Sequence, residues 1–173
     1  MKSFCILTLT ATFAAASARY AQNPFSTDTK NAYNGIKNTI TRAADEMPEG
    51  DYSYSTVPGK TRTYGEIISH IADIQMVLCG IVKGEQKQPT FEKTKKTKAE
   101  ATAALKESFD YCDSVYNSMT DADAAMMVKM FGREMTKLGV LDFNVAHDNE
   151  MYGTAVAYLR MKDLVPPSSQ RRR

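Results

Sequence analysis

Apolar residues recur at helical spacing in four segments of this chain. Between residues 27 and 47 they follow one another at three- and four-residue steps, and Pro48-Glu49-Gly50 ends the segment. The same spacing predicts helices from 63 to 83, from 97 to 119 and from 136 to 162. No run shows the clean alternation of a half-buried strand. Four amphipathic helices of this length predict an all-α fold, a four-helix bundle.

Two of these helices begin at a recognisable start signal. Thr63 and Glu66 fit a capping box, in which a threonine and a glutamate three residues later satisfy each other's backbone N–H groups. Thr97 and Glu100 repeat this spacing at the start of the next helix. The signals place both helix N-termini to within a residue or two.

Residues 120–136 have a weaker pattern than the rest. A short helix over 121–130 is one interpretation, and Gly132 interrupts it. Methionines gather in and beside this stretch: Met119, Met126, Met127, Met130 and Met135.

The N-terminus has the layout of a secretory signal peptide. Lys2 supplies a positive start, residues 4–16 are uncharged and mostly apolar, and Ala16-Ser17-Ala18 is a small-x-small cleavage site. The apolar run is too short to span a bilayer comfortably. These features predict three parts: a signal peptide over 1–18, a mature domain over 19–165 and a flexible C-terminal tail over 166–173.

Whether the signal peptide is removed determines whether the protein is released or stays anchored in the membrane. An uncleaved N-terminal anchor is the alternative to a removed signal peptide. No other segment approaches the length and apolarity of a membrane span. We therefore expect a secreted or periplasmic protein without stable membrane insertion after cleavage.

Composition and charge narrow the function classes. The chain has 173 residues, of which 43% are hydrophobic and 24% charged, which is typical of one globular domain. Its formal net charge is +2, so no strong attraction to nucleic acid is expected. The basic run over 93–98 and the terminal Arg171-Arg172-Arg173 are local, and we interpret both as solvated surface.

Two cysteines remain once the signal peptide is removed. Cys79 and Cys112 form an even pair in an oxidising compartment, which favours a disulfide between them. Such a bond would close a loop of some thirty residues and stabilise the fold by about 3 kcal/mol in the loop-entropy model. Two buried free thiols are the alternative.

The chain has only two histidines, and each lies on or beside the apolar face of a predicted helix. His70 is three residues after Ile67 and four before Ile74. His147 lies within the predicted inner seam of the last helix, which consists of Val140, Asn144, His147, Met151, Thr154 and Tyr158. Bundles build metal sites from side chains that project inward from facing helices. Met151, one turn after His147 on the same face, occupies the position where a further ligand would complete a three-ligand site.

Several blocks of this sequence resemble the DinB-like family of four-helix proteins. The resemblance covers nearly all of the mature chain and rests on the spacing of these blocks: Met47-Pro48, Tyr64-Gly65-Glu66-Ile67-Ile68-Ser69-His70-Ile71-Ala72-Asp73, His147-Asp148-Asn149-Glu150-Met151-Tyr152-Gly153, Tyr158-Leu159-Arg160 and Val165-Pro166-Pro167. It implies a divalent metal, often nickel or zinc, on three histidines. Carried over by position, the three ligands are His70, His147 and Met151, so the third is not histidine here.

This departure leaves three interpretations of the site. A thioether is a poor ligand for zinc or nickel. The site is either degenerate, or weakened and completed by a water or an acid, or selective for copper(I), which soft ligands suit. Among the nearby acids Asp73, Asp148 and Glu150, Asp73 is the best placed by helical direction. The methionines named above favour copper, although methionine is also a common core filler.

The resemblance also limits the choice of activity. Some family members transfer groups with cytosolic low-molecular-weight thiols, and export argues against that activity here. A metal-dependent hydrolase or transferase is one expectation, with the metal activating a water or thiol nucleophile. A bundle without metal or catalysis, which binds a partner or a small apolar ligand, is the other. Family members often dimerise, so a homodimer is compatible with either.

Overall fold

The computed structural model describes residues 23–170 and confirms the all-α bundle. Its core is a set of four long helices: α2 (Pro24–Glu46), α3 (Tyr64–Lys83), α5 (Lys98–Ser118) and α7 (Lys137–Met161). The predicted signal peptide and the three terminal arginines lie outside the described residues.

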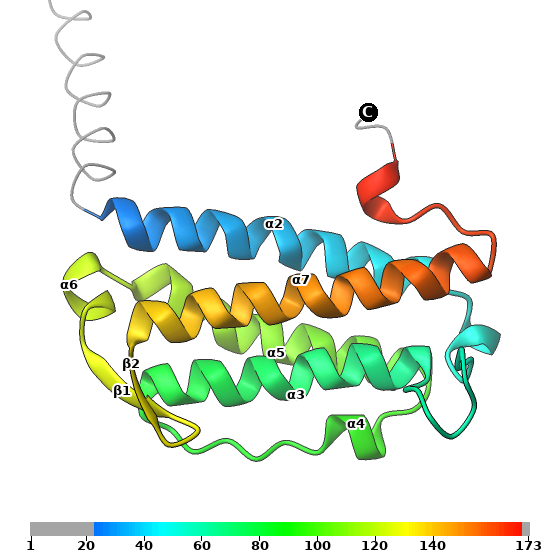
Figure 1. Ribbon diagram of the computed structural model, residues 1–173, viewed down its shortest axis with the longest axis horizontal. Helices are drawn as coiled ribbons and strands as arrows, with labels where there is room; N and C mark the ends of the chain where they lie inside the picture. Colours follow the sequence, from blue (N-terminus) through cyan, green and yellow to red (C-terminus); the bar gives the residue numbers. More distant parts are fainter. Residues whose placement is uncertain (1–22, 171–173) are drawn as a thin grey trace, which may run out of the picture.

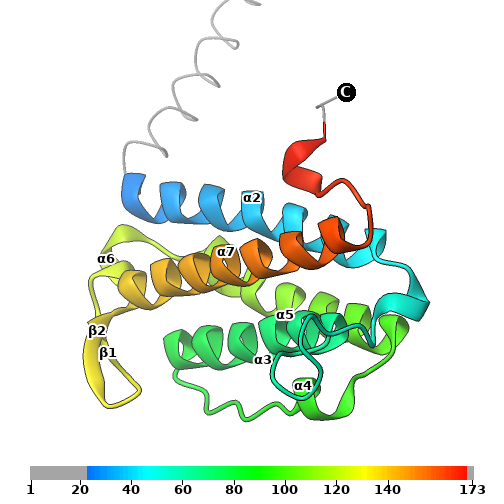
Figure 2. The ribbon, with the colours of Figure 1, turned by 45° about the vertical axis from the view of Figure 1, so that its right-hand side comes forward.

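The four helices form a ring in which each contacts two others. α3 packs against α5 and α7, and α2 packs against the same two helices from the opposite corner. α2 and α7 run in one direction, whereas α3 and α5 run in the other (Figures 1 and 2). The connection over residues 84–97 causes this, because it returns along α3 before α5 begins, and it contains the short helix α4 (Phe91–Thr94).

Helix starts agree with the sequence signals. In both predicted capping boxes the threonine side chain accepts from the N–H of the glutamate, and the glutamate side chain accepts from the N–H of the threonine. α2 begins earlier than predicted, at Pro24, because proline is favourable in the first turn of a helix.

The segment that leads from α2 to α3 is a loop that packs against both helices. It begins with a short 3-10 helix, η1 (Glu49–Asp51). Tyr52 is buried, and its hydroxyl donates to the carbonyl of Ala44 at 2.7 Å. The N–H of Gly65 donates to the carbonyl of Tyr52 at 2.8 Å. These bonds fix the loop against α2 and α3, and the loop carries Arg62 toward the candidate site.

Residues 120–136 differ from the prediction. They form a short helix, α6 (Asp121–Ala124), and an antiparallel hairpin of β1 (Met127–Met130) and β2 (Arg133–Thr136). The expectation of a chain without strands was wrong here. Each strand has only four residues, and the turn is Phe131-Gly132, with φ of 49° and 85°. A phenylalanine at positive φ gives no turn signal in the sequence.

The buried face of α7 is shifted relative to the predicted seam. Thr154, expected in the seam, is exposed, and Ala155 is buried in its place. The centre of the face passes through Asn144 and Asp148, both 0% exposed. His147 is partly buried at the edge of this face, as is the methionine one turn later.

The C-terminal segment is not a free tail over its described part. Pro167 is buried and begins a 3-10 helix, η2 (Pro167–Ser169). The hydroxyl of Tyr152 donates to Ser168 Oγ at 2.8 Å and accepts from the Ser168 N–H at 2.9 Å. Gln170 Nε2 donates to Glu46 Oε1 on α2. These bonds dock residues 166–170, the described part of the predicted tail, on α2 and α7.

One helix meets the length and apolarity of a membrane span. α3 passes that test by length and composition. No segment after the N-terminal apolar run was predicted from the sequence to do so. Most of α3 is buried inside the bundle between α5 and α7. Its apolarity is therefore that of a central core helix.

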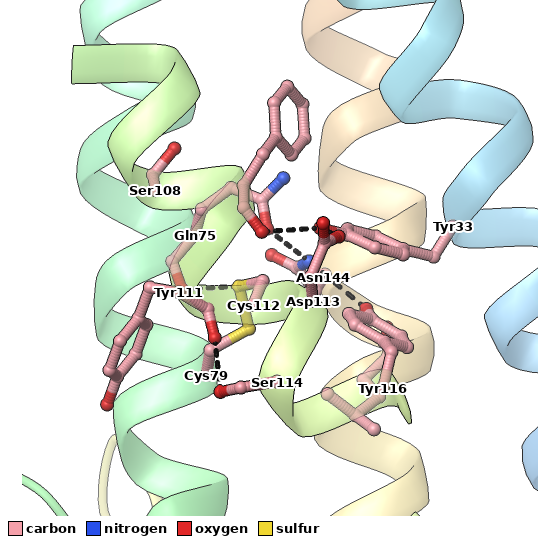
Figure 3. Close-up of a disulfide and its surroundings, with 12 residues drawn as sticks. Tyr33, Gln75, Cys79, Ser108, Tyr111, Cys112, Asp113, Ser114, Tyr116 and Asn144 are labelled. Atoms are coloured by element: carbon pink, nitrogen blue, oxygen red, sulfur yellow. Dashed lines mark hydrogen bonds between the residues drawn. A yellow bond between two sulfur atoms is a disulfide. The ribbon is translucent and has the colours of Figure 1, made fainter. Parts of the chain in front are cut away.

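A disulfide joins the two parallel helices α3 and α5 (Figure 3). Cys79 and Cys112 are both 0% exposed, and their Cα atoms are 5.5 Å apart. Cys112 Sγ also lies 3.3 Å from the carbonyl oxygen of Gln75, one turn before Cys79 on α3. The bond therefore fixes α5 to the middle of α3.

We expect removal of this disulfide to destabilise the fold. Replacing both cysteines, Cys79→Ala with Cys112→Ala, should lower the free energy of unfolding by about 3 kcal/mol, because the unfolded chain regains the entropy of an open loop. Urea unfolding of the variant and of the oxidised wild type measures the difference. Titration of free thiols in the unfolded wild type is the control, and two reactive thiols there would contradict the bond.

Candidate metal site

The two histidines meet between α3 and α7. His70 on α3 and His147 on α7 face each other with their Nε2 atoms 3.3 Å apart and their ring centroids 5.2 Å apart. Two ligands of one ion with metal–nitrogen bonds of about 2.0–2.1 Å have nitrogens roughly 3–3.5 Å apart. The observed separation of the Nε2 atoms falls within that range.

His70 is oriented from its other ring nitrogen. Its Nδ1 lies 2.8 Å from Glu92 Oε2, and Arg62 Nε donates to Glu92 Oε1 at 2.7 Å. Burial alone would raise the pKa of Glu92, but the bonds from Arg62 and His70 outweigh burial and lower it. Glu92 is therefore an ionised acceptor, and we assign the Nδ1 hydrogen of His70 to its bond with this carboxylate.

Asp73 acts on this arrangement indirectly. It was expected as the acid best placed to join the histidines, and that expectation is wrong. Its two carboxylate oxygens accept from the backbone N–H groups of Phe91 and Glu92 at 2.8 and 3.0 Å. Asp73 thus anchors the first turn of α4, and α4 in turn presents Glu92 to His70.

A buried polar network lies on the other side, beside His147. Gln75 Nε2 donates to Asp148 Oδ2 at 3.0 Å, and Asn144 Nδ2 donates to Gln75 Oε1 at 2.8 Å. Asn144 also donates to the hydroxyl of Tyr116 at 3.1 Å (Figure 3). Asp148 Oδ1 has no hydrogen-bond partner within residues 23–170, and it lies 4.0 Å from His147 Nδ1, which is also buried and without one.

These contacts limit which ring nitrogen of each histidine can carry the hydrogen. With the hydrogen of His70 on Nδ1, its Nε2 presents a lone pair to His147. If His147 carries its hydrogen on Nε2, its Nδ1 lone pair is buried beside the carboxylate of Asp148, which is unfavourable. If it carries the hydrogen on Nδ1, two Nε2 lone pairs face each other at 3.3 Å. A cation between the Nε2 atoms would resolve this conflict.

Burial keeps the site competent to bind a cation. It lowers the pKa of His70, and the charges of Arg62 and His147 lower it further, against the opposing effect of Glu92. His70 is therefore neutral at neutral pH, and its Nε2 lone pair is available to a metal.

A pocket of about 670 Å³ adjoins the histidine pair. Arg62 and Glu92, which both contact His70, lie in its wall, as does Met151. Its other lining comes from the loop before α3, from the first turn of α3 and from the second half of α7: Thr56, Lys60, Thr61, Ile67, Thr154, Ala157, Tyr158 and Met161. Met151, at the third family position, thus lines the cavity that adjoins the histidines.

In the described part of the chain, the structure brings no further candidate ligand of these types to the two histidines. Within residues 23–170 there is no cluster of three or more histidine, cysteine or acidic side chains that could hold a metal. Glu150 is exposed. The methionine-rich stretch belongs to the hairpin region, where Met126 and Met127 are exposed and Met130 is in the core, and none of it lines the described pocket. The structure therefore brings two nitrogen donors together, with Met151 nearby.

Sequence reasoning missed three residues of this site. Glu92 and Arg62 lie in connections whose path helical periodicity does not predict. Gln75 is an uncharged polar residue within the apolar stripe of α3, and it is 0% exposed. A buried glutamine must find partners for both ends of its amide, so its position was the one available signal of a polar network.

Comparison with known proteins decides the family. The sequence profile of the DinB superfamily matches residues 35–155, well over half of the chain. The chain belongs to the DinB superfamily. No curated protein matches it in sequence.

Solved structures agree with this assignment. A DinB-like protein from Bacillus cereus has a TM-score of 0.71 and 17% identity, covering 80% of this chain and 93% of that one. A DinB-like protein from Bacillus subtilis has a TM-score of 0.68 and 16% identity, covering 84% and 99%. A mycothiol-dependent maleylpyruvate isomerase has a TM-score of 0.54 and 14% identity, covering 76% of this chain and 59% of that one. At these identities the likeness concerns the fold.

Asp148 should make the stability of the metal-free protein depend on pH. Burial raises its pKa to about 6 from an ordinary value of 3.8, so the native state holds this proton more tightly than the unfolded chain. The free energy of unfolding is therefore highest below pH 4. It falls by up to about 3 kcal/mol as the pH rises through 6. Asp148→Asn should remove most of this loss. Urea unfolding between pH 4 and 7.5 with a chelator measures it.

The matched control is Asp110→Asn, on the exposed surface of α5. This variant should keep the pH dependence of the wild type. If Asp148→Asn also keeps it, then Asp148 does not titrate as its burial requires.

Proposed function

We propose that this DinB-superfamily protein holds a divalent cation on the Nε2 atoms of His70 and His147. The observation that carries the proposal is the 3.3 Å separation of these atoms, together with the carboxylate on His70 Nδ1. A histidine whose other ring nitrogen donates to a carboxylate is the usual arrangement of a metal-binding imidazole.

The donor set fits an ion that keeps open coordination positions. The protein offers two imidazole nitrogens, and a thioether takes the place of a third. Zinc and nickel suit imidazole, whereas the thioether adds little for them. A bound ion of this kind acts as a Lewis acid on whatever ligand fills its free positions. We therefore propose an exchangeable zinc or nickel site that is weaker than a three-histidine site.

The residues around the ion have separate tasks. Glu92 fixes the tautomer and the orientation of His70, and Arg62 keeps Glu92 ionised. Asp148 lies on the Nδ1 side of His147 and favours a hydrogen there. Met151 lines the pocket and offers a thioether where the family has a third strong ligand.

A copper(I) site is the second candidate, and one observation favours it. Met151 lies one helical turn after His147 and lines the adjoining pocket, so a soft donor is available beside two imidazoles. Copper(I) should then bind more tightly than zinc. Loss of copper(I) but not of zinc in Met151→Ala would identify this case.

Metal analysis of the purified mature protein tests the site. After incubation with zinc or nickel and removal of excess metal, we expect up to one ion per chain in the wild type and none in His70→Ala. Met151→His should bind at least about tenfold more tightly, because a third imidazole replaces the thioether.

Met126→His is the matched control, because it adds a histidine at an exposed position of the hairpin region. It should leave affinity at the wild-type level. An empty wild type with a filled Met151→His variant would show that the geometry is intact but the native site does not hold metal. Equal metal content in wild type and His70→Ala would sink the proposal.

We also propose that the protein works outside the cytoplasm. The layout of residues 1–18 supports export, and a buried disulfide between Cys79 and Cys112 fits an oxidising compartment. In such a setting the cytosolic thiols used by some relatives are not abundant.

Export predicts a defined N-terminus. Expressed in a bacterial host with a secretion pathway, the full chain should appear in the periplasm or medium and begin at Arg19. Ala18→Arg should block cleavage and leave the longer chain with the membranes. N-terminal sequencing of both products measures this. A full-length wild type that begins at Met1 in the cytoplasm would contradict export.

A further inference from the structure

The one carboxylate in the lining of this pocket, that of Glu92, already has both oxygens paired. The two carboxylate oxygens of Glu92 are taken by Arg62 and His70, at 2.7 and 2.8 Å. The hydroxyl of Tyr158 donates to the carbonyl of Arg62 at 2.6 Å, and that of Thr154 donates to the carbonyl of Glu150 at 3.2 Å. The lining therefore offers no unpaired carboxylate to a cationic ligand, and the hydroxyl hydrogens of Tyr158 and Thr154 are already used.

Cationic donors, in contrast, remain available. Lys60 lines this pocket, and its ammonium group makes no hydrogen bond or ion pair with any residue from 23 to 170. Arg62 uses Nε for Glu92, and its Nη2 is 3.5 Å from His70 Nδ1, a nitrogen that already donates to Glu92. The terminal nitrogens of Arg62 thus keep donors for another partner. Lys60 and Arg62 are two cations beside a single carboxylate whose oxygens are both already paired. The charge at this pocket therefore favours an anionic ligand.

The rest of the lining is apolar. Ile67 is buried at the base of α3, and Met151, Ala157 and Met161 lie along one side of α7. Met161 is 58% exposed, although it is a large apolar side chain at the rim of a pocket. Exposed apolar surface that borders a concave site is typical of a ligand-binding pocket. Its volume is within the range of pockets for small organic ligands.

We infer that this pocket binds an organic anion with an apolar body, of the kind represented by a medium-chain carboxylate. The carboxylate pairs with Lys60 and Arg62, and the hydrocarbon packs on Ile67, Met151 and Met161. The inference builds on the proposed function, because it assigns the ligand class of the cavity that adjoins the ion site. The cations and the apolar lining do not themselves require the ion.

Calorimetric titration with octanoate tests the inference on the mature protein, both zinc-loaded and treated with chelator. Octanoate should bind at least about tenfold more tightly than octanol or octylamine, since only the carboxylate pairs with the two cations. Acetate should not bind measurably, because it lacks the apolar body. Lys60→Glu should weaken octanoate binding at least about tenfold and leave octanol unchanged.

Lys129→Glu is the matched control, because it makes the same change of charge at an exposed position of the hairpin, at the other end of the bundle (Figure 1). It should bind octanoate like the wild type. Equal affinity for octanoate and octanol, or loss of octanoate binding in both lysine variants alike, would overturn the inference. Octanoate binding that depends on Lys60 in a protein that takes up no metal would support the pocket and reject the ion site. Metal uptake without octanoate binding would support the ion site and reject the inferred ligand of the pocket.

Discussion

One buried amide fixes α3 against α7, and the candidate site depends on it. Gln75 is 0% exposed, and its side chain binds Asn144 through its oxygen and Asp148 through its nitrogen. An amide bonded at both ends allows a single register between the two helices, because sliding either helix by one turn would leave buried polar groups unpaired. In that register the imidazoles of His70 and His147 face each other, which apolar packing alone would not specify.

The four helices and the connections contribute differently to the site. The helices supply the two imidazoles at a fixed separation, and the connections supply the groups that orient one of them. Glu92 comes from the turn of helix in the long connection, and Arg62 comes from the loop before α3. A bundle can therefore keep its ligands while its connections alter the charge and the access of the cavity beside them.

Local signals predicted much of this structure, and long-range contacts account for the rest. Capping boxes at Thr63 and Thr97, and the position of each histidine on or beside the apolar face of its own helix, follow from helical spacing within one segment. The partners of those histidines do not, because Glu92 reaches His70 only through a connection anchored by Asp73. The hairpin escaped prediction because its turn uses Phe131 at positive φ, and Thr154 was misplaced because α7 presents a face centred on Asp148.

The long return of the chain between α3 and α5 gives the disulfide a topological meaning. Cys79 and Cys112 lie on either side of residues 84–97, so the bond closes the polypeptide into a covalent ring that includes the whole connection. A protease that cuts this surface segment once would open the ring without dividing the molecule. The two halves of the bundle, one with His70 and the other with His147, would stay tethered at their shared core. Outside the cell, where proteases are common and reductants scarce, such a ring preserves the molecule after a single break.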